Sequence, residues 1–196
     1  MLEKIASDTG AMETHTGIRF ELSNPTPEDV CVEDIAHALA LQGRFNGHSM
    51  FFWSVGQHSL LVADYLKMRE MTDRIVLLGL LHDAAEAYIG DVTSPVKAMC
   101  PQVRELEARI MAAVYEGLGV EPSVGFENKI VKNADLAVIG VEAISLLPSG
   151  GEWWGLPDMD VKTAFWMQDE DRVIPDAMEL VEMTFLKEFY RLKGVL

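Results

Sequence analysis

The sequence is short of positive charge. Its 196 residues include 16 lysines and arginines against 31 aspartates and glutamates, which gives a formal net charge of −15. A surface this acidic repels phosphate backbones and anionic lipids, so we expect neither a nucleic-acid polymer nor a membrane as a partner. A small anionic substrate is compatible with this charge, because a bound cation reverses the local field.

Cysteine is equally scarce, and long apolar runs are absent. Cys31 and Cys100 lie far apart and belong to no C-x-x-C pair, which predicts reduced thiols and no disulfide framework. The N-terminal segment has no apolar core of signal-peptide length. Runs such as IVLLGLL are too short to span a bilayer. We therefore expect a soluble, cytoplasmic protein.

Internal repeats, low-complexity stretches and linkers are also lacking, and the length suits one domain. Apolar residues recur at helical spacing through most of the chain. This spacing predicts helices over 32–41, 54–67, 75–91, 101–118, 125–147, 161–168 and 175–193. Two alternating segments, 17–22 and 50–54, suggest a small hairpin, and residues 1–17 are expected to be loose. The expected fold is one all-α domain of six or seven helices.

One predicted core helix carries polar side chains for which packing has no use. Residues 75–91 read IVLLGLLHDAAEAYIGD, and the first seven are apolar or glycine, as in a buried helix. The same segment carries His82, Asp83 and Glu86 into that core and ends with Asp91. Burying a charge is costly unless the charge is paired or bound to a metal. We therefore favour a divalent metal site.

Helical spacing directs these side chains toward one point. His82 and Glu86 are four residues apart and share a helix face, with Asp83 beside them. Gly90 suits the left-handed position that ends a helix, which turns Asp91 back toward the same end. A lone core histidine is more often a packed residue than a ligand, but the neighbouring carboxylates favour the metal.

Two residues from other helices can complete this site. Asp135 lies in the apolar stretch NADLAVIGV, where an unpaired carboxylate is destabilising. The alternative for Asp135 is that it turns outward or pairs with Lys132. His58 lies on the apolar stripe of the 54–67 helix, where a capping or packing role is the alternative. Two histidines and two carboxylates suit one divalent ion: manganese, iron, cobalt, nickel or zinc, and magnesium less well.

These residues together resemble a known family. The strings QHSLLVADYL and LLHDAAEAYIGDVTSPVK are similar to those of HD-domain metal-dependent phosphohydrolases, in the branch of the bacterial HD-domain 5′-deoxynucleotidases and their phage-type relatives. The resemblance implies a helical bundle whose metal-site core spans about residues 42–145, with C-terminal helices over 157–193 packed on it. It implies that the metal ligands are His58, His82, Asp83 and Asp135.

The resemblance also implies roles around the metal. It assigns the acid/base or water-orienting group to Glu86, the substrate-side carboxylate to Asp91 and a phosphate contact to Arg44. His48 can reach a phosphate and Lys97 can neutralise one, although a loop histidine and a lysine after a proline turn are more often surface residues.

The expected activity is phosphate release from deoxynucleoside 5′-monophosphates by a metal-activated water. Release of triphosphate from deoxynucleoside triphosphates is the close alternative, because the loop RFNGHSMFFWS and Gln57 depart from the deoxynucleotidase pattern. Cleavage of a cyclic nucleotide or a guanosine alarmone is a different HD chemistry, and the lack of an extra histidine pair argues against two-metal phosphodiesterases. A non-catalytic metal-binding helical module is the third hypothesis. The final helix and the Trp153–Trp154 pair can form a homodimer interface.

Overall fold

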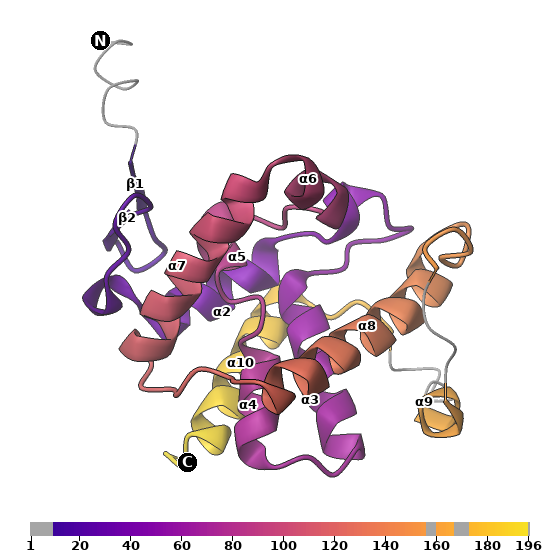
Figure 1. Cartoon of the computed structure of the whole chain (residues 1–196). Helices are drawn as coiled ribbons and strands as arrows, with labels where there is room; N and C mark the ends of the chain where they lie inside the picture. The colour runs from indigo at the N-terminus through magenta and orange to yellow at the C-terminus, as the bar shows by residue number, and fades with distance from the viewer. Residues whose placement is uncertain (1–9, 156–159, 167–172, 196) are drawn as a thin grey trace.

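A computed structural model of the chain describes residues 10–155, 160–166 and 173–195, and Figure 1 shows their arrangement. The described residues are mainly helical with one two-stranded hairpin, which confirms the predicted fold class. The elements are β1 Ala11–Glu13, β2 Arg19–Glu21, the 3-10 helix η1 Pro27–Asp29, α2 Val32–Leu41, the 3-10 helix η2 Phe45–Gly47, α3 Val55–Met68, α4 Asp73–Leu80, α5 Glu86–Ile89, α6 Ser94–Met99, α7 Pro101–Gly117, α8 Phe126–Leu146, α9 Val161–Trp166 and α10 Met178–Leu192.

Helix α3 lies at the centre and packs against α2, α4, α8 and α10. It begins where the sequence predicted. Ser54 Oγ accepts a hydrogen bond from Gln57 N at 3.1 Å, and the Gln57 side chain in turn accepts from Ser54 N at 3.5 Å. This capping box satisfies two free N–H groups of the first turn. The cap places His58 one turn inside the helix, in the core, where its exposed fraction is 0%.

The segment predicted as one helix over 75–91 is interrupted, so that prediction was wrong. Helix α4 ends at Leu80, turns follow, and α5 begins only at Glu86. In between, Glu86 N donates to Asp83 O at 2.9 Å, a three-residue spacing tighter than that of an α-helix. Gly90 has a positive φ of 82°, as expected, but its ψ of 164° is not that of a left-handed helical cap. The four-residue spacing therefore does not explain how His82 and Glu86 reach one site.

The hairpin also differs from the prediction. Strand β2 pairs antiparallel with β1, with Met12 opposite Phe20, and not with residues 50–54. Closing a short local loop costs less entropy than joining segments thirty residues apart. Phe20 is buried and stacks on Tyr88, with ring centroids 3.8 Å apart, which fixes the hairpin to the core. Residues 1–17 were expected to be loose. The first nine lie outside the described residues, and the strand over Ala11–Glu13 shows that the expectation was wrong for this part of the segment.

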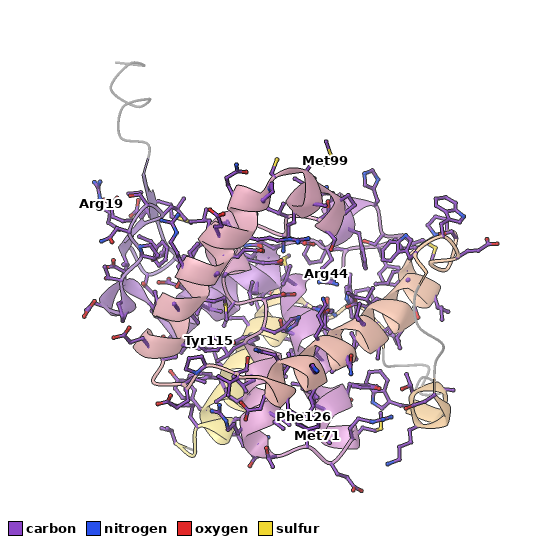
Figure 2. All side chains as sticks on the ribbon, viewed as in Figure 1. Arg19, Arg44, Met71, Met99, Tyr115 and Phe126 are labelled. Carbon is purple, nitrogen blue, oxygen red and sulfur yellow. The ribbon has the colours of Figure 1, made fainter. Side chains whose placement is uncertain are left out.

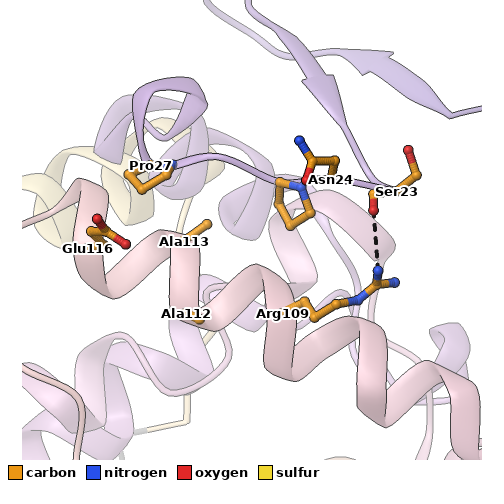
Figure 3. A pocket seen from close by; sticks show the side chains of 8 residues that line it. Ser23, Asn24, Pro27, Arg109, Ala112, Ala113 and Glu116 are labelled. Carbon is orange, nitrogen blue, oxygen red and sulfur yellow. Dashed lines mark hydrogen bonds between the residues drawn. The ribbon is translucent and has the colours of Figure 1, made fainter.

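The chain after the hairpin packs on α7, as Figure 3 shows. Arg109 on α7 donates to Ser23 O at 3.2 Å, beside a groove of about 290 Å³. The approach is closest at Gly117, where an added Cβ would lie 2.5 Å from Pro27 O, so that any side chain there would push the two segments apart.

The last helices contribute to the core through one face each. Val181 and Phe185 of α10 are buried, whereas Met178 is 41% exposed. On α8, Glu142 occupies a buried position, whereas Ile144 is 53% exposed. The helix predicted over 161–168 is present as α9, and residues 167–168 lie outside the described residues. None of the described helices is long and apolar enough to cross a bilayer.

Candidate metal centre and adjoining cleft

Four predicted ligands from three segments meet at one point. His58 comes from α3, His82 and Asp83 from the turns after α4, and Asp135 from α8. His58 Nε2 lies 3.3 Å from His82 Nε2, 3.6 Å from Asp83 Oδ2 and 3.3 Å from Asp135 Oδ1. His82 Nε2 lies 3.1 Å from Asp83 Oδ2 and 3.8 Å from Asp135 Oδ1. Donors about 2.1 Å from a shared ion lie roughly 3.0 to 4.2 Å from one another, and the distances from the two Nε2 atoms fall within that range. The donor atoms of His58, His82 and Asp83 all lie within 4.8 Å of one another, and Asp135 Oδ1 approaches the same two Nε2 atoms.

The Nδ1 atom of each imidazole is hydrogen-bonded, and this determines the protonation state of the Nε2 atom that faces the other ligands. His82 Nδ1 lies 2.8 Å from the carbonyl oxygen of Gly79, and His58 Nδ1 lies 2.9 Å from Glu142 Oε1. Both partners accept, so each Nδ1 carries a proton and, in a neutral ring, each Nε2 presents a lone pair. Two lone pairs facing each other at 3.3 Å repel unless a proton or a metal ion lies between them. The donor set therefore fits a divalent metal.

The charges around these ligands favour a cation as well. Burial alone lowers the pKa of His82, but Asp83 and Asp135 raise that pKa well above its usual value. Burial works in the opposite direction on the carboxylates, and the two histidines nevertheless hold the pKa of Asp83 and Asp135 well below the usual range. Both carboxylates are therefore ionised at neutral pH and available as oxygen ligands.

Asp135 both faces the two histidines and pairs with Lys132, which were the two alternatives for this residue in the sequence. Its Oδ1 faces the histidines, whereas Lys132 Nζ donates to its Oδ2 at 2.6 Å. The lysine side chain is 64% exposed, so this pair is at the rim of the site and does not remove the carboxylate from the metal position.

The sequence analysis missed Glu142, which supports the site from behind. This fully buried α8 side chain accepts from His58 Nδ1 at 2.9 Å and from Trp53 Nε1 at 2.7 Å through Oε1. Its Oε2 lies 3.1 Å from Arg44 Nη2. Although burial raises it, the pKa of Glu142 is lowered overall by Arg44 and His58, so Glu142 is ionised. Asp135 and Glu142 are seven residues apart and share a helix face, a signal that was available in the sequence.

A cleft of about 680 Å³ opens beside Asp83 and Asp135. Its walls come from the 44–48 loop, from residues 91–97 and from α8. The remaining predicted site residues all line it, namely Arg44, His48, Glu86, Asp91 and Lys97. Phe45 and Trp154 also line the cleft, with ring centroids 5.8 Å apart, and the sequence analysis gave neither a substrate role.

Arg44 lies in the interior between α6 and α8, as Figure 2 shows. The residue is 7% exposed, and besides its contact with Glu142 its Nη1 lies 3.8 Å from Asp83 Oδ2. It therefore links the wall of the cleft to the carboxylates of the site. A guanidinium has five N–H donors, so this pairing leaves donors for a phosphate.

Glu86 is buried in the cleft wall and has an altered acidity. Burial, together with the charges of Asp83 and Asp91, raises the pKa of Glu86 to about 8. Lys97 Nζ donates to its Oε1 at 3.1 Å and also lies 2.5 Å from Glu107 Oε1, so Lys97 is already paired with carboxylates. Among the described residues, Glu86 Oε2 is buried and has no hydrogen-bond partner.

The loop that carries Phe45 is held in an unusual conformation. Phe45 and Asn46 have positive φ values of 57° and 51°, which are uncommon for side chains with a Cβ and rarest for bulky ones. The loop ends are tied by Arg44 N to Trp53 O at 2.8 Å, and Met50 N donates to Leu146 O of α8 at 2.9 Å. Backbone strain of this kind is concentrated at functional sites.

Comparison with known proteins assigns the class. The family described as HD domain matches residues 45–132, which include His58, His82, Asp83, Glu86 and Asp91. Two curated relatives extend the similarity beyond that match. The uncharacterized protein YfdR of Escherichia coli (strain K12) is 31% identical over 143 residues, which cover 73% of this chain and 76% of the relative. The uncharacterized protein RCAP_rcc00048 of Rhodobacter capsulatus is 38% identical over 134 residues, 65% of this chain and 68% of the relative.

The chain therefore belongs to the HD-domain family, whose members are metal-dependent phosphohydrolases. The curated relatives carry no assigned substrate in their names. The family match ends before Asp135, so the assignment of this residue as a ligand rests on the distances given above.

Proposed function

We propose that this protein releases phosphate from deoxynucleoside 5′-monophosphates, with one divalent ion held by His58, His82, Asp83 and Asp135. The observation that carries the proposal is the convergence of four donor atoms from three segments beside a cleft. A cleft of about 680 Å³ lies within the range of roughly 300 to 1,000 Å³ that small-molecule sites occupy.

A divalent ion bound there supplies Lewis acidity, which activates water at neutral pH and polarises a phosphoryl oxygen. Nitrogen and oxygen donors together suit manganese, iron, cobalt, nickel or zinc better than magnesium. Glu142 holds His58 with its Nε2 toward the other donors, and the Gly79 carbonyl does the same for His82.

Glu86 is the acid that the reaction needs. In the metal-free chain its pKa is raised to about 8 by burial and by the charges of Asp83 and Asp91, and it lines the same cleft as Asp83 and Asp135. A carboxyl group in this state can donate its proton to the sugar oxygen that leaves the phosphate. We assign to Asp91, at the same wall, the contact with the sugar hydroxyl.

The cleft also has groups for the two ends of a nucleotide. Arg44 and Lys132 line it and can attract a phosphate dianion, although the chain as a whole is acidic. Lys97 lines it too, but is already paired with Glu86 and Glu107. Phe45 and Trp154 provide aromatic surface on which a base can stack. The preference for a deoxyribose rests on the resemblance of the HD motif segment to the 5′-deoxynucleotidases.

A second depression favours triphosphate release as the alternative. It measures about 280 Å³ and shares His82, Asp83, Lys132 and Asp135 with the metal site and the cleft rim. Tyr115, Ser123 and Asn128 add polar side chains to its lining, and Leu78 and Val131 add apolar ones. A phosphate tail longer than one phosphate has space on this side of the ligands.

The test is a panel of ribo- and deoxynucleoside mono- and triphosphates, incubated with manganese, cobalt, magnesium or a chelator. We expect phosphate release from deoxynucleoside monophosphates with manganese or cobalt, and none with chelator. Release of triphosphate instead selects the alternative. Absence of turnover for every nucleotide and metal contradicts the proposal and favours a non-catalytic metal-binding module.

A further inference from the structure

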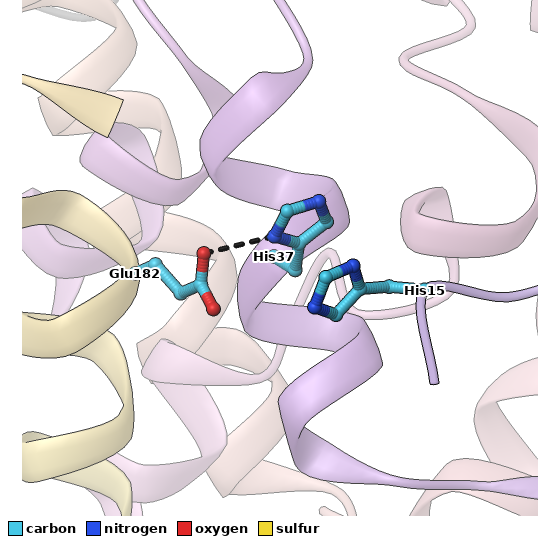
Figure 4. A group of neighbouring side chains, drawn as sticks. All are labelled: His15, His37 and Glu182. Carbon is cyan, nitrogen blue, oxygen red and sulfur yellow. Dashed lines mark hydrogen bonds and ion pairs between the residues drawn. The ribbon is translucent and has the colours of Figure 1, made fainter. Parts of the chain in front are cut away.

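A second group of potential metal ligands lies apart from the cleft, and Figure 4 shows it. His15 follows β1, His37 lies on α2 and Glu182 lies on α10. One donor atom of each residue lies within 4.8 Å of the donor atoms of the other two. None of the three lines the cleft beside Asp83 and Asp135.

The N-terminal segment is fastened so that His15 stays at this position. Thr16 N donates to Asp34 Oδ1 at 2.7 Å, and Thr16 Oγ1 donates to Asp34 Oδ2 at 2.9 Å. Asp34 is 2% exposed and lies one helical turn before His37 on α2. These two bonds fix the backbone beside His15, whose ring stacks on the His37 ring with centroids 3.5 Å apart and planes 15° apart.

Glu182 brings a carboxylate close to the two histidines. Glu182 Oε2 lies 2.9 Å from His37 Nδ1, and both side chains are 28% exposed, so an ion from solvent can reach them. Two ligands of one tetrahedral ion lie about 3.3 Å apart, so this pair is close to the spacing that a shared ion requires. Imidazole nitrogens bind a metal in the ring plane, so the stacked His15 ring has to turn about its side-chain bonds for one ion to meet both histidines, and its exposed side chain leaves room for that turn.

We propose that His15, His37 and Glu182 bind a second divalent ion of the zinc, cobalt or nickel class. Two imidazoles and one carboxylate are an established zinc ligand set that leaves the fourth position to water. The ligands come from the N-terminal hairpin, α2 and α10, so the ion ties the hairpin to the C-terminal helix. Its effect is to stabilise the folded chain, because it binds a site that exists only after folding. The inference does not rest on the proposed nucleotidase activity.

The test measures zinc bound per chain in the untagged full-length protein, by elemental analysis after a chelator strip, zinc loading and desalting. The variants are His15→Gln, His37→Gln and Glu182→Gln. The matched control is Glu179→Gln, an exposed carboxylate one turn earlier on α10. Melting temperatures with and without zinc are measured on the same samples.

We expect two zinc ions per chain in the wild type and in the control, and one in each of the three variants. The retained ion shows that the variants are folded. The increase in melting temperature on adding zinc is expected to shrink in the three variants only. Asp83→Ala, which disrupts the cleft, is expected to keep the second ion.

Failure of the proposed function is distinguishable from failure of this inference. If the cleft binds no zinc, the wild type holds one ion and His37→Gln holds none, which supports the second site alone. Unchanged zinc content in all three variants overturns the inference, as does equal loss in the Glu179→Gln control.

Discussion

Replacing Glu86 by glutamine separates two effects of this carboxyl group, namely the stability lost by burying its charge and its contribution to the rate of catalysis. The residue is 4% exposed, and burial with Asp83 and Asp91 nearby raises its pKa from 4.5 to about 8. A group whose folded pKa exceeds its unfolded pKa holds its proton more tightly in the folded state. The wild type therefore loses stability as the pH rises from 4.5 to about 8.

The size of this loss follows from the interval between the two pKa values. At about 1.4 kcal/mol per pKa unit, it amounts to on the order of 5 kcal/mol for an isolated group. Glutamine cannot ionise, and its side-chain oxygen can still accept from Lys97, which lies 3.1 Å from Glu86 Oε1. Glu86→Gln is therefore expected to be more stable than the wild type at pH 8, with the difference closing toward pH 5.

Urea denaturation of the metal-free proteins at pH 5, 6.5 and 8 measures this difference in the free energy of unfolding. Glu107→Gln is the matched control, because Glu107 also contacts Lys97, at 2.5 Å, but from a less buried position. The control is expected to show no gain at pH 8. A Glu86→Gln difference that is the same at every pH would refute the assigned acidity. The same variant is expected to bind metal normally and to hydrolyse nucleotide roughly 10²-fold to 10⁴-fold more slowly.

Three further predictions concern the metal and the substrate. Asp83→Ala is expected to lose activity and the metal ion of the cleft, and metal retained at the wild-type level after dialysis would contradict its role as a ligand. Glu142→Gln leaves Arg44 without its buried counter-charge and weakens the orientation of His58. We expect destabilisation of roughly 3 kcal/mol in urea and metal affinity about 10-fold to 100-fold lower by calorimetry, and unchanged affinity would argue against this support. Trp154→Ala is expected to raise KM for nucleotides but not for a phosphate ester without a base, and equal effects on both would exclude base stacking.

The parts of the site that sequence could predict are those with a local signal. His82 and Asp83 interrupt an apolar run, and a buried charge in such a run calls for a partner or a metal. Ser54 and Thr72 are residues of the kind that cap helix N-termini, and they cap α3 and α4. Here the chemistry of a few neighbouring residues was enough.

Other features depend on tertiary structure. The turns after Leu80 that direct His82 and Glu86 to one site break the helical spacing, and nothing in the apolar pattern marks that break. Glu142 supports His58 across 84 positions in the chain, so its role appears only when α8 packs on α3. Trp154 reaches the cleft from a distant loop in the same way.

The central claim is that His58, His82, Asp83 and Asp135 share one divalent ion that serves phosphoester hydrolysis. Anomalous diffraction from crystals grown with manganese tests it most directly. The account predicts a manganese peak within bonding distance, about 2.0 to 2.3 Å, of all four donor atoms. A fully occupied manganese position elsewhere, with no peak between the two Nε2 atoms, would contradict it.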